Sequence, residues 1–314
     1  MHRLALRVIR IAFAVTCLAS GGCVVASGTN ESLDDAELSG AEAETVDSST
    51  EALSQPSFLT NYYWNSAYDK GLTKTMISDQ EGFCALTNIG GRFKTTADFV
   101  GVWQSGGHFT LSGTTNQTGE AVHASARCVP ISQFSTHGWA FSGVFYTGWT
   151  SNGTTNTWGV SMDLTGWDRA QSRCWVNGVG GDFTRGGEVS IDSAGSFAPN
   201  WHLGLSGVGY KGQSLVGRAS CVKFVASSAL ANTTVTGFWT QSNGTGPSNR
   251  NVKLAKASTH FCFLNDVGMG TTQWNDSAYI TFSSTDGYYY LTGSWSGGNA
   301  RIFARATCVA YNQL

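Results

Sequence analysis

The chain has 314 residues and is close to neutral, with 19 Lys and Arg against 21 Asp and Glu and a formal net charge of −2. This balance gives no support for binding to nucleic acid or to anionic lipid, which need a strongly basic surface. Only 13% of the residues are charged, whereas 39 are glycine and 12% are aromatic. Such a composition favours strands and tight turns over long helices.

Residues 1–23 predict an export signal. Arg3, Arg7 and Arg10 give the segment a positive start. An apolar run at 11–18 follows, and it is too short to span a bilayer as a helix. We therefore expect this segment to direct the chain out of the cytoplasm.

The signal ends in the small residues Ala19-Ser20-Gly21-Gly22, followed by Cys23. This run resembles the lipobox of bacterial lipoproteins, and the resemblance covers residues 1–23 alone. It implies that Cys23 is lipidated and becomes the new N-terminus, which would anchor the protein to a membrane. Ser20 stands where such motifs usually carry an aliphatic residue. The alternative is ordinary signal-peptidase cleavage, for instance after Gly21 or Ala26.

Residues 24–57 predict a disordered acidic tether. Between positions 31 and 51 there are eight acidic residues, and residues 24–56 contain no Lys, Arg or aromatic side chain. Such a segment cannot bury enough apolar surface to offset the loss of chain entropy on folding.

Six cysteines follow in three pairs at nearly constant spacing. Cys84 with Cys128, Cys174 with Cys221, and Cys262 with Cys308 are separated by 44, 47 and 46 residues. A fixed period predicts one structural unit built three times. An even number of cysteines in an exported chain also predicts disulfides, one in each unit.

The three units, expected at 58–131, 140–226 and 232–314, share a pattern of short strands. One strand surrounds each first cysteine, an aromatic-x-Leu strand lies between the cysteines, and a last strand ends at the second cysteine. The pattern predicts an all-β fold of three tandem, disulfide-closed antiparallel repeats. The connections between units contain no Pro-rich or charged linker, which favours units packed together in a pseudo-threefold arrangement.

A carboxylate stands fourteen residues after each first cysteine, as Asp98, Glu188 and Asp276. One interpretation is a ligand contact repeated three times. We favour an internal ion pair with an arginine near the second cysteine. These arginines are Arg127, Arg218 and Arg305. One carboxylate per unit is too few for calcium, which takes six to eight oxygens, and we expect no metal or other cofactor.

A tryptophan precedes each first cysteine, as Trp64, Trp149 and Trp239, and Asn152 and Asn243 follow two of them closely. Aromatic faces beside amides suit sugar rings, so these five residues form the predicted binding site. The alternative is a buried tryptophan that anchors each unit, with the Asn-Gly sequences forming turns.

Catalytic motifs are absent from the sequence. There is no His-Glu-x-x-His, no Gly-x-Ser-x-Gly and no phosphate-binding loop, and the histidines share no position in the units. We therefore expect a non-enzymatic, lipid-anchored protein for adhesion or glycan binding. The alternatives are a structural or protein-interaction module of the cell envelope, and a secreted hydrolase whose site has no known motif.

The expected partners are glycans or cell-surface proteins. The expected contact with a membrane is through the lipid anchor alone, and no nucleic acid is expected. The expected location is that of an outer-membrane lipoprotein, or otherwise the periplasm or the extracellular space.

Overall fold

The structure is a computed structural model that describes residues 54–135, 145–151, 160–184, 186–192, 199–207, 215–223, 234–240, 251–270, 273–296 and 302–311. Cys23, Asn152 and Asn243 lie outside the described residues, as does the side chain of Trp149. In the described part of the chain, no helix is long and apolar enough to cross a membrane.

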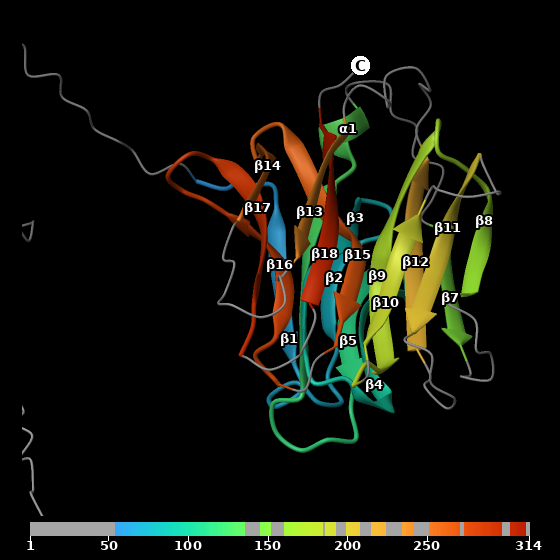
Figure 1. The fold of residues 1–314 in the computed structure, drawn as a ribbon. Helices are drawn as coiled ribbons and strands as arrows, with labels where there is room; N and C mark the ends of the chain where they lie inside the picture. The colour runs from blue at the N-terminus through green and yellow to red at the C-terminus, as the bar shows by residue number, and fades with distance from the viewer. Residues whose placement is uncertain are drawn as a thin grey trace, which may run out of the picture. The chain divides into compact units, whose positions relative to one another are not determined.

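The predicted all-β class is confirmed, because the described strands form three antiparallel sheets of six strands each (Figure 1). Sheet A has the order β1 (Thr60–Asn65), β6 (Val122–Pro130), β3 (Gly82–Gly91), β16 (Ser277–Phe282), β17 (Tyr288–Ser294), β14 (Val252–Lys256). Sheet B has the order β7 (Phe145–Ser151), β12 (Leu215–Lys223), β9 (Ser172–Asp182), β4 (Lys94–Ser105), β5 (His108–Thr114), β2 (Lys74–Ser78). Sheet C has the order β13 (Thr234–Thr240), β18 (Ile302–Ala310), β15 (His260–Met269), β10 (Gly187–Asp192), β11 (Asn200–Gly207), β8 (Val160–Asp168). A four-residue helix, α1 (Ser132–Ser135), follows β6.

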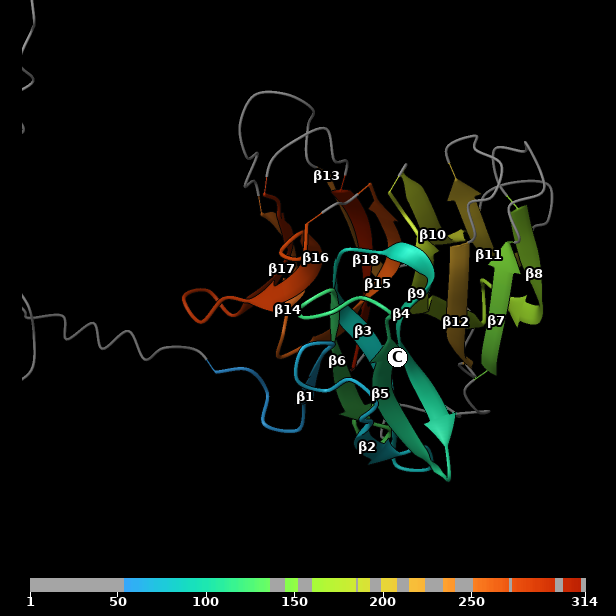
Figure 2. The same ribbon diagram turned by 90° about the horizontal axis from the view of Figure 1, so that it is seen from below.

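Each sheet is shared by two units. The first unit supplies β1–β6, the second β7–β12 and the third β13–β18, and each unit divides its strands equally between two sheets. The sheets join at β3–β16, β9–β4 and β15–β10, so the third unit pairs directly with the first. In both views β16 lies beside the strands of the first unit (Figures 1 and 2). Strand pairing therefore closes the three units into a ring with the same strand order in every sheet.

The three predicted disulfides are confirmed, and each joins neighbouring strands of one sheet. Cys84–Cys128 links β3 to β6, Cys174–Cys221 links β9 to β12, and Cys262–Cys308 links β15 to β18. Both cysteines of each pair are buried. Three disulfides indicate that the chain folds in an oxidising compartment outside the cytoplasm.

Aromatic side chains from all three units pack where β3, β9 and β15 contact one another. The ring of Phe83 lies 5.4 Å from those of both Trp175 and Phe261, and Trp175 lies 5.2 Å from Phe263. Nearly every residue of these three strands is buried, on both faces. Burial on both faces explains why Phe83–Leu86 and Phe261–Leu264 are apolar at four successive positions and lack the alternation of a half-buried strand.

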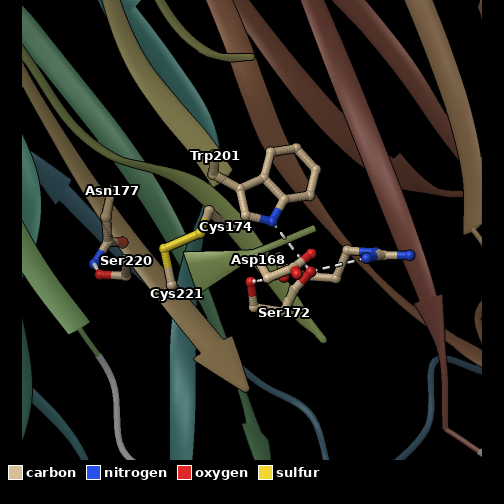
Figure 3. Close-up of a disulfide and its surroundings, with 8 residues drawn as sticks. Asp168, Ser172, Cys174, Asn177, Trp201, Ser220 and Cys221 are labelled. Carbon is tan, nitrogen blue, oxygen red and sulfur yellow. Dashed lines mark hydrogen bonds between the residues drawn. A yellow bond between two sulfur atoms is a disulfide. The ribbon is translucent and has the colours of Figure 1, made fainter. Parts of the chain in front are cut away.

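A β-bulge recurs three residues after each first cysteine, at Thr87, Asn177 and Asn265. In the second unit, Asn177 Nδ2 donates to Ser220 Oγ at 2.5 Å, beside the Cys174–Cys221 disulfide (Figure 3). A bulge bends a strand and strengthens its twist, so it lets one strand leave the centre and join the sheet of the next unit.

Candidate functional site

The structure places two of the predicted site tryptophans in the interior. Trp64 is 0% exposed and Trp239 is 3% exposed. The Trp64 indole N–H points at the backbone carbonyls of Asp69 and Leu72, at 3.0 and 3.1 Å. A side chain that is buried to this extent offers no ring face to a sugar, so Trp64 and Trp239 act as anchors of their units. This corrects their predicted role in ligand binding and agrees with the alternative interpretation.

The predicted ion pair of Asp98 with an arginine is wrong. The Asp98 carboxylate accepts hydrogen bonds from the backbone N–H groups of Lys94 and Thr95, both at 2.8 Å. It also accepts from Thr115 Oγ1 at 2.5 Å and from Gln117 Nε2 at 2.8 Å. Four donors on one buried carboxylate hold the corner between β3 and β4, which is a structural role.

Asp276 has the same kind of structural role in the third unit. Its Oδ1 accepts from the backbone N–H and the hydroxyl of Ser296, each at 2.8 Å, and the residue is buried. The predicted pairing with an arginine is therefore wrong here as well, because the bonded donors are neutral.

Glu188 does not share the structural position of the two aspartates. In each unit, the glycine six residues after the first cysteine pairs across the sheet with a strand of another unit. Its partner is Ser277 for the first unit, Phe99 for the second and Glu188 for the third. Glu188 is thus one residue further along its strand than Asp98 and Asp276 are, because the corner before it is one residue shorter. Successive side chains of a strand point to opposite faces, so Glu188 points to the outer face instead of the interior.

The arginines near the second cysteines have other partners. Arg127 Nε donates to Asn61 Oδ1 at 2.9 Å. The Arg218 guanidinium lies 3.6 Å from the ring centre of Trp103, and Arg305 lies 3.9 Å from Asp266.

The ring of units creates three equivalent outer rows, one on each sheet, that cross the junction between two units. Row A consists of Tyr63, Ser125, Asn88, Tyr279 and Thr292. Row B consists of Gly148, Arg218, Gly178, Gly101 and Ser112. Row C consists of Phe238, Arg305, Asp266, Ser190 and Gly204. The same five places in the fold thus carry three different chemistries.

Row A combines aromatic rings with neutral hydrogen-bonding groups. Tyr63 is 50% exposed, and Ser125, Asn88 and Tyr279 are partly exposed. Asn88 lies between the two tyrosines in the strand order, and its buried amide Oδ1 has no hydrogen-bond partner. Row A is therefore the outer row in which two tyrosines flank a neutral, partly exposed amide.

Row B is covered by its own sheet. The ring of Phe99 lies on Gly178, where an added Cβ would come within 2.6 Å of it. Arg218 lies over Phe99 and Trp103, with its guanidinium carbon 5.0 and 3.6 Å from the ring centres. The rings of Phe99 and Trp103, which cover this row, are thus already stacked on a cation, and Phe99 also lies on backbone.

Row C is charged. Asp266 is buried near Glu188, and the Arg305 guanidinium lies 3.9 Å from the Asp266 carboxyl. Burial, together with the adjacent charge of Glu188, raises the pKa of Asp266 to about 8.

The described residues offer no metal-binding site. In the part of the chain that the structure describes, no group of three or more His, Cys, Asp or Glu side chains could hold a metal ion.

Sequence reasoning missed row A because its members come from five strands of two units. The one signal available was the position four residues after each first cysteine, which is Asn88, Gly178 and Asp266 in turn. This position differs in chemistry among units whose framework is constant. No protein-family model and no curated protein sequence matches this chain.

Proposed function

We propose that the protein is an exported binding protein that recognises glycans through row A of sheet A. The observation that carries the proposal is the alignment of Tyr63, Asn88 and Tyr279 on one outer face, with the amide between the two rings. Rings can stack on the C–H face of a sugar, while the amide bonds to sugar hydroxyls.

The dimensions of row A suit an extended ligand. Tyr63 and Tyr279 are three strands apart, which corresponds to about 14 Å at the usual strand spacing. The partly exposed hydroxyl of Ser125 lies in the same line, whereas Thr292 at the end of the row is buried. A chain of several sugars could contact both rings at once, whereas a single sugar could contact one.

The binding experiment uses the folded, oxidised protein on a glycan array, followed by calorimetric titration with the best ligand. Tyr279→Ser places in row A the residue that row C carries at the same place, Ser190, so the backbone should tolerate the change. Removing a stacking ring should weaken binding about tenfold or more.

The matched control is Phe238→Ala. Phe238 is 52% exposed and occupies in row C the place of Tyr63 in row A. Its loss should leave glycan affinity within about twofold. An array without any bound glycan, or equal weakening by both variants, would rule out row A as a glycan site.

A lipid anchor at Cys23 is the second part of the proposal. Its support is the run of small residues before Cys23 and the export signal that precedes it. Mass spectrometry of the N-terminal peptide from the membrane fraction should find a diacylglycerol adduct on Cys23. A Cys23→Ala variant that still fractionates with the membrane would contradict this anchor.

A further inference from the structure

The interior holds a cation that the glycan site does not use. Arg127, next to Cys128 on β6, is only 4% exposed. Its guanidinium carbon lies 4.6 Å from the ring centre of Tyr289, which belongs to the third unit. Its Nε donates to Asn61 Oδ1 at 2.9 Å. The side chain thus lies at the junction where the ring of units closes.

No carboxylate among the described residues forms an ion pair with this guanidinium. The ion pairs Lys74–Asp69, Lys253–Asp286 and Arg305–Asp266 do not include Arg127. Arg127 Nη1 is buried and has no acceptor. An arginine stays protonated in proteins, and a buried charge without a counter-charge is costly, so this site favours an anion.

Tyr311 supplies a second buried donor near Arg127. Its ring packs on Phe58 and Phe134, at 5.2 and 5.5 Å, and its hydroxyl is buried without a partner. Arg127 and Tyr311 lie within electrostatic range of each other. Burial raises the pKa of the Tyr311 phenol, so the hydroxyl keeps its proton and can donate it to an acceptor.

We propose that Arg127 Nη1 and the Tyr311 hydroxyl together bind a small monovalent inorganic anion of the halide class. A halide neutralises the guanidinium and accepts both hydrogen bonds without needing donors of its own.

The other two junctions lack this cation. Arg127 is replaced at the equivalent positions by Ser220 and Thr307, and Ser220 already accepts from Asn177. The anion site is therefore specific to the contact between the first and third units, the two that are not consecutive in the chain.

The test is urea unfolding of the oxidised protein at constant ionic strength, with sodium chloride exchanged for sodium gluconate. A ligand that binds only the folded state raises the equilibrium constant of folding. The rise is proportional to the ligand concentration once that concentration exceeds the dissociation constant. Each tenfold rise in chloride should then raise the folding constant about tenfold. Arg127→Met should abolish this dependence, and Tyr311→Phe should weaken the chloride dissociation constant about fivefold.

The matched control is Lys253→Met, since Lys253 is an exposed cation that pairs with Asp286. This variant should keep the full chloride dependence. Should Arg127→Met fail to fold, crystals of the wild-type protein grown in bromide provide the second measurement. They should show an anomalous peak between Arg127 Nη1 and the Tyr311 hydroxyl. Equal folding constants in chloride and gluconate, or bromide found at the surface alone, would overturn the proposal.

Discussion

At the scale of single residues, a glycine facing each of Trp64 and Trp239 shows the role of these two recurring tryptophans. A Cβ at Gly113 would lie 2.5 Å from the ring of Trp64, and one at Gly293 would lie 2.3 Å from that of Trp239. Each ring therefore lies directly on the backbone of the aromatic-x-Leu strand in its own unit. At Trp64 and Trp239 this packing, and not ligand binding, explains the tryptophan of the repeat.

Trp64→Ala and Trp274→Ala form a matched pair of substitutions. Trp64 is fully buried, and its loss should lower the free energy of unfolding by about 3–5 kcal/mol, the usual cost of a large cavity. Trp274 is 50% exposed, and its loss should change that free energy by less than about 0.5 kcal/mol. Chemical denaturation of the two variants measures both values, and similar losses would contradict the assigned burial.

Asp266 makes stability depend on pH. Its pKa is raised from 3.8 in the unfolded chain to about 8 in the folded protein, by burial first and by Glu188 second. The folded state thus keeps a proton that the unfolded state releases. The stability from this proton is fully present below the unfolded pKa and is lost as pH rises through about 8.

His123 has the opposite effect on the pH dependence of stability, and it acts at lower pH. Burial lowers its pKa from 6.5 to about 4, so its contribution to stability is lost as pH falls from 6.5 towards 4. From pH 6.5 to 8, Asp266 should dominate, with a fall in unfolding free energy of roughly 2 kcal/mol.

Asp266→Asn should remove most of the pH dependence of the unfolding free energy between pH 6.5 and 8. An amide is a suitable replacement because Asn88 occupies the same place in the first unit. Denaturation curves at four pH values measure this dependence. An unchanged pH dependence of the unfolding free energy in the variant would show that another group causes it.

At the scale of elements, the sequence predicted the strands, the disulfides and the repeat, because these depend on local patterns and on cysteine spacing. It failed at Glu188, where equal distance from a cysteine suggested an equal position. The corner before Glu188 is one residue shorter than the corner before Asp98, and one residue moves a side chain to the other face. Counting along a sequence cannot detect a corner of different length between two strands.

The disulfides should resist reductant while the protein is folded, since every bonded cysteine is buried. Alkylation and mass spectrometry in excess reductant should find six protected cysteines in the native protein and six free thiols after unfolding. Replacing Cys84 and Cys128 by serine should cost about 2–4 kcal/mol of unfolding free energy, because the unfolded chain loses one cross-link. Rapid labelling of the native protein would contradict the buried arrangement.

At the scale of the whole molecule, the sequence favoured a pseudo-threefold packing of the units but did not specify which strands join them. The pairing of β3 with β16 joins strands from opposite ends of the folded region, and no local pattern specifies a partner at such a distance. The consequence is that three copies of one framework present three rows of different chemistry. Row A collects two tyrosines and an amide from the first and third units, so the glycan site requires the closed ring.

The most direct measurement is the affinity of an Asn88→Gly variant for the glycan that the wild-type protein selects. Row B carries Gly178 at this place, so the fold accepts glycine there, and Tyr63 and Tyr279 remain. Loss of the amide bonds should weaken binding about tenfold while the melting temperature stays within a few degrees. Unchanged affinity in this variant would contradict glycan recognition by row A.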